Sequence, residues 1–202
     1  MYITDIVNYD KKRSKVICED ETFLLYKGEI KRFGLTADLE ISDELYYKIS
    51  DEILYKRAKE RSIHLIEAMD RTEYQIRQKL IEGYYPDKVI ERVIAFLIKY
   101  GLIDDEQYTK KYVEMNISKK SIKAIALDLK IKGIPRDIAE KILIKDVEKE
   151  KVQIIKLLEK KHYNCNSDDI KEKRRIVDFL LRRGYDYELI NSSMKEYKNE
   201  YY

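Results

Sequence analysis

The stretch Leu80–Ile90, LIEGYYPDKVI, decides the fold because its pattern recurs twice further along the chain. The second copy is Leu129–Ile138, LKIKGIPRDI, and the third is Leu180–Leu189, LLRRGYDYEL. In each copy a helical segment stops at a glycine, an aromatic or aliphatic residue follows, and an acidic residue opens the next apolar segment. The glycines, at positions 83, 133 and 184, lie about 50 residues apart, and a fixed period is typical of a repeat architecture.

The apolar residues after Ser42 recur at helical spacing, and local signals mark where helices start. Ser42 with two acidic residues after it is typical of a helix start, and Thr72 with Gln75 forms a capping box. A glycine after a helix favours a left-handed cap, so we expect one at each of the three glycines. The expected helices cover 43–69, Thr72 to Gly83, Pro86 to Gly101, a segment opened by Asp104–Glu106, 119–132, a segment opened by Pro135, 146–162, 168–183 and 186–198.

Residues 1–42 differ from the rest because β-prone stretches alternate with polar ones. Three strands are expected, over 2–7, 16–18 and 22–26. A sheet this small needs a cover for its apolar face. The segment Leu35–Leu39 and the start of the next helix are the candidates.

These assignments predict a mainly α fold of tandem three-helix repeats preceded by a small N-terminal β-rich region. The predicted divisions are 1–42 for the β-rich region and 43–101, 102–145 and 146–202 for the three repeats. A unit of about 45 residues is small for independent stability, so neighbouring repeats are expected to support one another.

The composition limits the class of protein and its location. Lys and Arg number 41 against 38 Asp and Glu, and a net charge of +3 does not by itself predict nucleic-acid binding. Cys18 and Cys165 lie far apart in unlike contexts, which argues against a disulfide framework and for a reducing compartment. No apolar run reaches transmembrane length, and the N-terminus lacks a signal-peptide pattern. We therefore expect a cytoplasmic protein that does not bind membranes.

No motif for catalysis, a cofactor or a metal stands out. His64 and His162 have no cysteine or carboxylate at ligand spacing, and the glycines form no phosphate-binding loop. Asp104-Asp105-Glu106 could suggest a divalent-metal cluster, but a helix N-terminus accounts for three acids without a metal. We expect a protein that is not an enzyme, without cofactor or metal.

Basic residues recur on one face of two predicted helices. The candidate contacts for a partner are Lys119, Lys120, Lys123 and Lys130 in the middle repeat, and Lys171, Arg174, Arg175, Arg182 and Arg183 in the last. Such strips can neutralise phosphates or meet an acidic protein. The alternative is a solvated amphipathic face whose field is partly cancelled by Glu172 and Asp178.

The chain is also rich in tyrosine, with 18 residues. Tyrosine rings can stack on single-stranded bases. The alternative, which we favour, is that the rings pack against helices and keep their hydroxyl groups in water.

Three motifs resemble those of the RecX family, bacterial regulators of the RecA recombinase. Phe96–Tyr108, FLIKYGLIDDEQY, is similar to the family's signature, Lys119–Pro135 to its second segment and Phe179–Tyr185 to its third. Val16–Leu25 resembles the short β region that precedes the repeats in members of Gram-positive type. The chain departs from the pattern after the Lys119-Lys120 pair, where it has Ser121, Ala124 and Ala126 in place of glycine and arginines.

This resemblance implies a non-enzymatic protein that binds RecA and its nucleoprotein filament, and also DNA. We expect a monomer, and we expect the departure after Lys119-Lys120 to weaken direct DNA binding more than RecA binding. It implies that the protein lies in the filament groove and inhibits or modulates strand exchange and ATP hydrolysis. An alternative function is direct DNA binding by short helix-turn-helix-like units. A third is a helical scaffold for an unrelated protein.

Overall fold

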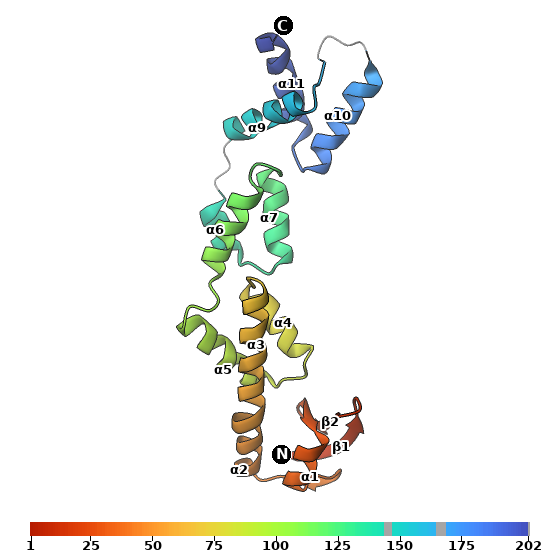
Figure 1. Ribbon diagram of the computed structural model, residues 1–202, viewed down its shortest axis with the longest axis vertical. Coiled ribbons are helices and arrows are strands. Elements are labelled where there is room, and N and C mark those ends of the chain that lie inside the picture. Colours follow the sequence, from red (N-terminus) through yellow and green to blue (C-terminus); the bar gives the residue numbers. More distant parts are fainter. Residues whose placement is uncertain (144–146, 165–168, 202) are drawn as a thin grey trace. The chain divides into compact units, whose positions relative to one another are not determined.

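The computed structural model describes residues 1–143, 147–164 and 169–201, and it confirms a mainly α chain with a small N-terminal antiparallel sheet (Figure 1). The chain divides into two compact units, Met1–Asp104 and Asp105–Tyr202. Cys165 and the predicted division between residues 145 and 146 lie outside the described residues. The divisions of the chain into repeats stay a prediction.

The N-terminal sheet has the order β3-β2-β1-β4 in the described part of the chain. Its strands are β1 (Tyr2–Asn8), β2 (Arg13–Cys18), β3 (Thr22–Tyr26) and β4 (Leu39–Glu40), and every pairing is antiparallel. The three predicted strands are confirmed, and the fourth was not predicted. Strand β4 pairs with the start of β1 and is two residues long. An alternating pattern cannot be recognised in a sequence this short.

A helix that was not predicted, α1 (Lys27–Phe33), follows β3 directly. After it, Leu35 lies in the same apolar core as Ile3 and Phe23 of the sheet. Leu35 thus serves as the predicted cover, whereas Leu39 belongs to the sheet itself.

The first unit continues with a helix that matches the predicted range 43–69 and contains a wide turn. It consists of α2 (Asp43–Lys48), the π-helical segment η1 (Ile49–Tyr55) and α3 (Lys56–Ala68). The signals for its start and for the next helix are confirmed: Ser42 Oγ accepts from the Leu45 amide, and Thr72 and Gln75 cap each other. The unit ends with α4 (Glu73–Ile81) and α5 (Asp87–Lys99).

The second unit contains six helices among its described residues. They are α6 (Asp105–Asn116), α7 (Ile122–Ile131), α8 (Arg136–Ile142), α9 (Val147–Lys160), α10 (Ile170–Arg182) and α11 (Tyr187–Tyr201). The predicted start of α7 at residue 119 is wrong, because Ser121 caps the helix by accepting from the Ala124 amide. Ile125 and Leu129 of α7 form one apolar core with Ile134, and Ile154, Leu158 and Leu180 belong to another.

The same hydrogen-bonding pattern ends several helices of both units. A residue that follows the helix adopts a left-handed backbone conformation. The residue after it donates its N–H to the carbonyl five positions earlier in the chain. The left-handed residues are Gly34, Tyr84, Gly101, Gly133, His162 and Gly184, with φ of 62°, 57°, 64°, 78°, 52° and 85°. The bonds that follow them run from Leu35 to Ile30, Tyr85 to Leu80, Leu102 to Leu97, Ile134 to Leu129, Tyr163 to Leu158 and Tyr185 to Leu180.

The predicted left-handed caps are confirmed at Gly133 and Gly184 and wrong at Gly83. In the first stretch Tyr84 takes this conformation instead. Two residues separate Gly83 from Pro86, whereas one separates Gly133 from Pro135, so Tyr84 is the structural counterpart of Gly133. Gly83 is needed for space, because a β-carbon there would lie 2.8 Å from Cε2 of Tyr85.

The left-handed His162 gives a stability test. Replacing His162 with glycine removes a strained backbone, so the free energy of unfolding should rise by about 1 kcal/mol. This gain should raise the thermal midpoint by about 2–4 °C. The control is His64→Gly, since His64 is exposed within α3 and glycine there should cost about 0.5 kcal/mol. Circular dichroism melts that show His162→Gly less stable than wild type would contradict the strain at this cap.

Candidate binding surface of the second unit

The N-terminus of α7 docks on the turn between α10 and α11. The Ser121 amide donates to the Arg183 carbonyl over 3.1 Å, and the Ile122 amide donates to Oε1 of Glu150 over 2.9 Å. Glu150 lies on α9 and is only 6% exposed. A carboxylate at a helix N-terminus satisfies free N–H groups and is stabilised by the positive end of the helix dipole. Residues far apart in sequence thus complete the cap of α7.

Small side chains make this approach possible. A β-carbon at Gly184 would lie 2.7 Å from Ser121 Oγ and 2.9 Å from the Ala124 β-carbon. Glycine is therefore needed here both for its positive φ and for space. The same contact accounts for Ser121 and Ala124, two of the residues that depart from the family pattern.

Tyr185 anchors the other side of the turn. Its side chain is 2% exposed, and its hydroxyl donates to Oε1 of Gln153 over 3.2 Å. Burial, helped by the charge of Glu150, raises the pKa of Tyr185 to about 12. The ring therefore stays neutral at physiological pH and packs in the apolar core with Leu180.

A groove of about 1380 Å³ lies next to the docked N-terminus. Exposed apolar side chains line it, with Leu127 59%, Leu181 42% and Tyr187 59% exposed. Basic side chains from two helices, Lys123, Lys130 and Arg182, line it as well, together with the acidic Glu140 and Asp186. Apolar side chains interleaved with cations suit a partner that is both apolar and acidic.

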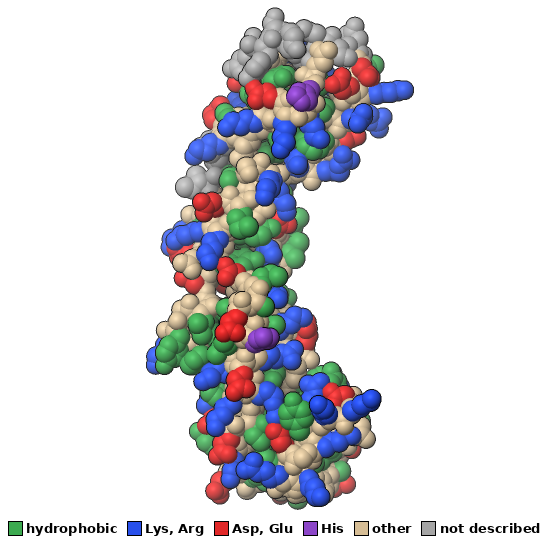
Figure 2. Space-filling model, viewed as in Figure 1, with side chains coloured by type: hydrophobic (Ala, Val, Ile, Leu, Met, Phe, Trp, Pro, Cys, Tyr) green, Lys and Arg blue, Asp and Glu red, His purple; other side chains and the backbone are tan. Residues whose placement is uncertain are grey.

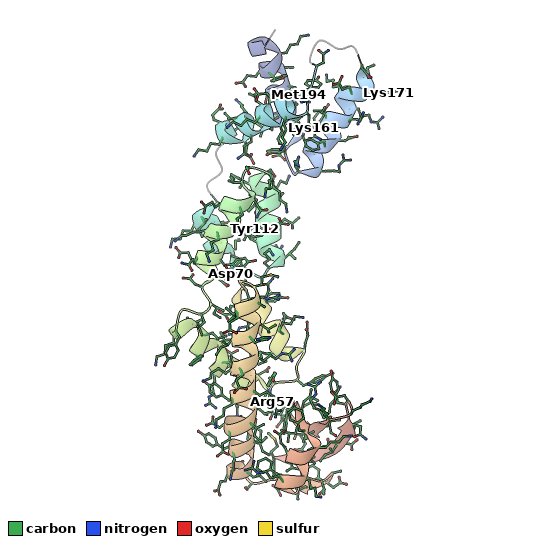
Figure 3. The ribbon with its side chains drawn as sticks, viewed as in Figure 1. Arg57, Asp70, Tyr112, Lys161, Lys171 and Met194 are labelled. Atoms are coloured by element: carbon green, nitrogen blue, oxygen red, sulfur yellow. The ribbon has the colours of Figure 1, made fainter. Side chains whose placement is uncertain are left out.

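A second group of cations extends along α10. Arg174 and Arg175 are exposed, while Ile176 and Leu180 of the same helix are buried. Figure 2 shows Lys and Arg side chains gathered over α10, and Figure 3 shows Lys171 near its first turn. Lys171, Arg174 and Arg175 form no ion pair with any residue that the structure describes. Among the described residues, nothing neutralises this strip, so it can meet the negative charge of a partner.

Two family models match segments of the helical part of the chain. The first three-helix domain of RecX matches residues 58–97, and the third matches residues 149–194. The regulatory protein RecX of Clostridium acetobutylicum is 34% identical over 212 residues, covering 98% of this chain and 97% of that protein. This chain belongs to the RecX family. The RecX of Clostridium tetani is 30% identical over 200 residues, covering 95% of this chain and 91% of that protein.

Solved RecX structures have the same fold. The crystal structure of RecX from Lactobacillus salivarius matches with a TM-score of 0.62 and 26% identity, covering 72% of this chain and 97% of that one. A second structure, of regulatory protein RecX, matches with a TM-score of 0.61 and 23% identity, covering 98% of this chain and 99% of that one. RecX is a family of regulatory proteins rather than enzymes.

The structure brings only some of the predicted contact residues of this RecX-family chain together. Lys123, Lys130 and Arg182 line one groove. Lys119 and Lys120 instead lie in the turn before α7, outside the helix face on which they were predicted.

Ion pairs hold two of the middle lysines. Lys120 Nζ lies 2.6 Å from Oδ2 of Asp128, which also accepts from the Tyr112 hydroxyl over 2.9 Å. The hydrogen bond to Asp128 raises the pKa of Lys120, and the hydrogen bond from Lys120 lowers the pKa of Asp128. Lys123 Nζ lies 3.1 Å from Oδ1 of Asp186. The middle strip thus offers fewer free charges than its sequence indicates.

Arg183 has a structural role. Its guanidinium carbon lies 4.1 Å from the centre of the Phe179 ring, and its carbonyl accepts from the Ser121 amide. Lys161 Nζ lies 4.9 Å from the same ring. Because Lys161 reaches Phe179 from the end of α9, no pattern within α10 could have predicted it.

The apolar part of the surface was not predicted from the sequence. Leu127 and Leu181 are exposed, although each lies close to the buried residues of its own helix, Ile125, Leu129 and Leu180. The signal available in the sequence was an apolar residue that lies outside the buried face of its helix, since such residues can mark a binding surface.

Two other features are absent from the residues described. No group of three or more His, Cys, Asp or Glu side chains that could hold a metal ion is found there. Within the same residues, no helix combines the length and apolarity that crossing a membrane requires.

The close approach at Gly184 predicts an unequal effect of alanine at two left-handed glycines. Gly101→Ala should cost about 1 kcal/mol, since only backbone strain opposes it and no atom lies within 4 Å of the new β-carbon. Gly184→Ala should cost about 2–4 kcal/mol, because overpacking adds to the strain. Denaturant unfolding of both variants measures the difference. Equal losses would show that the turn does not pack tightly on α7.

Proposed function

We propose that this RecX-family protein binds the RecA recombinase on its nucleoprotein filament through the second unit, and thereby inhibits strand exchange and ATP hydrolysis. The observation that carries the proposal is the unpaired basic strip of α10, Lys171, Arg174 and Arg175, in the same unit as a groove with exposed apolar side chains. Binding one state of a filament more tightly than another shifts the population of the states, so the inhibitor needs no chemistry of its own.

The mixed character of the surface favours a protein partner over DNA alone. A DNA backbone offers phosphates to the cations but leaves Leu127, Leu181 and Tyr187 without an apolar partner. A protein surface with acidic and apolar side chains satisfies both kinds of group. The order of the family motifs supports RecA as that protein.

The test follows ATP hydrolysis by the cognate RecA on single-stranded DNA as this protein is added. Wild type should lower the rate, and the double variant Arg174→Glu/Arg175→Glu should need an about tenfold higher concentration, because reversed charges repel an acidic partner. The matched control is Lys195→Glu, an exposed cation on α11 of the same unit, which should act like wild type. An unchanged ATPase rate together with no co-sedimentation with filaments would refute the proposal.

The second candidate function, direct DNA binding, has one observation in its favour: the cations of α10 form the kind of unpaired strip that neutralises phosphates. A gel-shift series at rising salt without RecA separates the two functions. Tight binding to a duplex that Arg174→Glu/Arg175→Glu abolishes would favour the second candidate.

A further inference from the structure

Tyrosines and cations gather at one place in the first unit, where the β1–β2 hairpin meets α3 and the turn between α4 and α5. The members, together called the aromatic–cation cluster, are Tyr9, Tyr26, Tyr84, Tyr85, Arg13, Lys15, Arg57 and Arg61. Figure 3 shows Arg57 on α3 beside the strands. On the face drawn in Figure 2, hydrophobic and basic side chains lie side by side over this region.

The rings and charges are in direct contact. The Lys15 Nζ lies 4.1 Å from the centre of the Tyr84 ring and donates to the Tyr84 hydroxyl over 2.7 Å. Tyr84 meets Tyr9 edge to face, with 5.8 Å between ring centres. Arg57 lies 4.6 Å from the centre of the Tyr26 ring. The left-handed backbone at Tyr84 thus places a ring against the hairpin, where glycine would place none.

Three arginines lie close enough to Tyr85 for their charges to act on its pKa. Burial raises the pKa of Tyr85, while the charges of Arg61, Arg57 and Arg13 oppose that rise. Three arginines from the hairpin and α3 therefore act on one hydroxyl group.

The cluster has more positive charge than its acidic partners neutralise. Arg13 pairs with Asp10 at 2.7 Å and Arg57 with Glu29 at 2.6 Å. Lys15 and the exposed Arg61 form no ion pair with a described residue. Exposed lysines at the hairpin turn, Lys11 and Lys12, add to this excess.

The rings of this cluster are also not fully used for packing. Tyr9 is 44% exposed and Tyr26 is 42% exposed. Rings that served only to fix the hairpin would be buried. The cation near the exposed Tyr9 ring that forms no ion pair with a described residue is Lys15, whose Nζ lies 5.4 Å from the ring centre. Exposed rings beside unpaired cations are the combination with which proteins hold single-stranded nucleic acids, whose bases stack on the rings while the phosphates meet the cations.

We propose that the aromatic–cation cluster is a binding site for single-stranded nucleic acid, with bases stacked on Tyr26 and Tyr9 and phosphates held by Lys15, Arg61 and the hairpin lysines. Duplexes fit this surface poorly, because their bases are already stacked and cannot reach the rings. The site uses no residue of the second unit and requires no RecA, so it is independent of the proposed function.

Fluorescence anisotropy of labelled oligo(dT) with the whole chain tests this site. Tyr26→Leu should weaken binding about tenfold, whereas Tyr26→Phe should keep the affinity of wild type, since a phenyl ring still stacks. Arg61→Glu should weaken binding and flatten its dependence on salt, because one phosphate contact is lost. The matched controls are Tyr47→Leu, at a ring 65% exposed on α2, and the exposed Lys48→Glu, and both should bind like wild type.

Two results would overturn the site. One is an equal affinity of wild type, Tyr26→Leu and Arg61→Glu, and the other is tighter binding of a duplex than of oligo(dT). Circular dichroism checks that Tyr26→Leu folds, and Arg61→Glu, which alters an exposed and unpaired side chain, decides the matter if it does not. A parallel titration with oligo(rU) tells whether DNA or RNA is preferred. Failure of the RecA proposal would appear separately, as filament ATPase that the protein leaves unchanged.

Discussion

The second unit depends on one contact, the docking of the α7 N-terminus on the turn between α10 and α11. Two backbone donors at the start of α7, the amides of Ser121 and Ile122, find their acceptors at the Arg183 carbonyl after α10 and at the Glu150 carboxylate on α9. The contact requires Gly184, since any β-carbon there would collide with Ser121 and Ala124. Lys123, Lys130 and Arg182 flank this contact and line the groove. The groove therefore exists only while helices α6–α8 stay packed against helices α9–α11.

A shared way of ending helices supports this arrangement. A left-handed residue followed by an apolar one turns the chain sharply and returns an apolar side chain to the helix that has just ended. Where the left-handed residue is glycine, another segment can approach closely, as at Gly184. Where it is Tyr84, the side chain itself becomes part of a surface. One backbone motif thus serves packing in the second unit and forms part of the proposed binding site in the first.

Features of the fold that depend on neighbouring residues, such as helix caps, were predicted from the sequence. Ser42, the Thr72–Gln75 box and the caps at Gly133 and Gly184 act through neighbouring residues, and the structure confirms them. The cap at Gly83 was placed one residue early, because the glycine there provides space for Tyr85. Contacts between residues far apart in the sequence leave no local pattern from which they could be predicted.

In the candidate binding surface, too, local features were predictable from the sequence and long-range contacts were not. Its basic residues were predicted from helical spacing, but their ion pairs were not. The pairing of Lys120 with Asp128 joins the turn before α7 to the middle of that helix, and the pairing of Lys123 with Asp186 joins α7 to the α10–α11 turn. These pairs depend on how the helices pack, so spacing along the chain overestimated the free charge of Lys119, Lys120, Lys123 and Lys130 as a group.

Native-state hydrogen exchange of the whole chain tests the central contact most directly. If the α7 N-terminus holds the second unit together, amides of α6–α8 and of α9–α11 should exchange with a common free energy of opening, with the Ser121 and Ile122 amides among the protected ones. Gly184→Ala should then lower protection in both groups of helices equally. Two different opening free energies, with the effect of Gly184→Ala confined to α9–α11, would contradict the account.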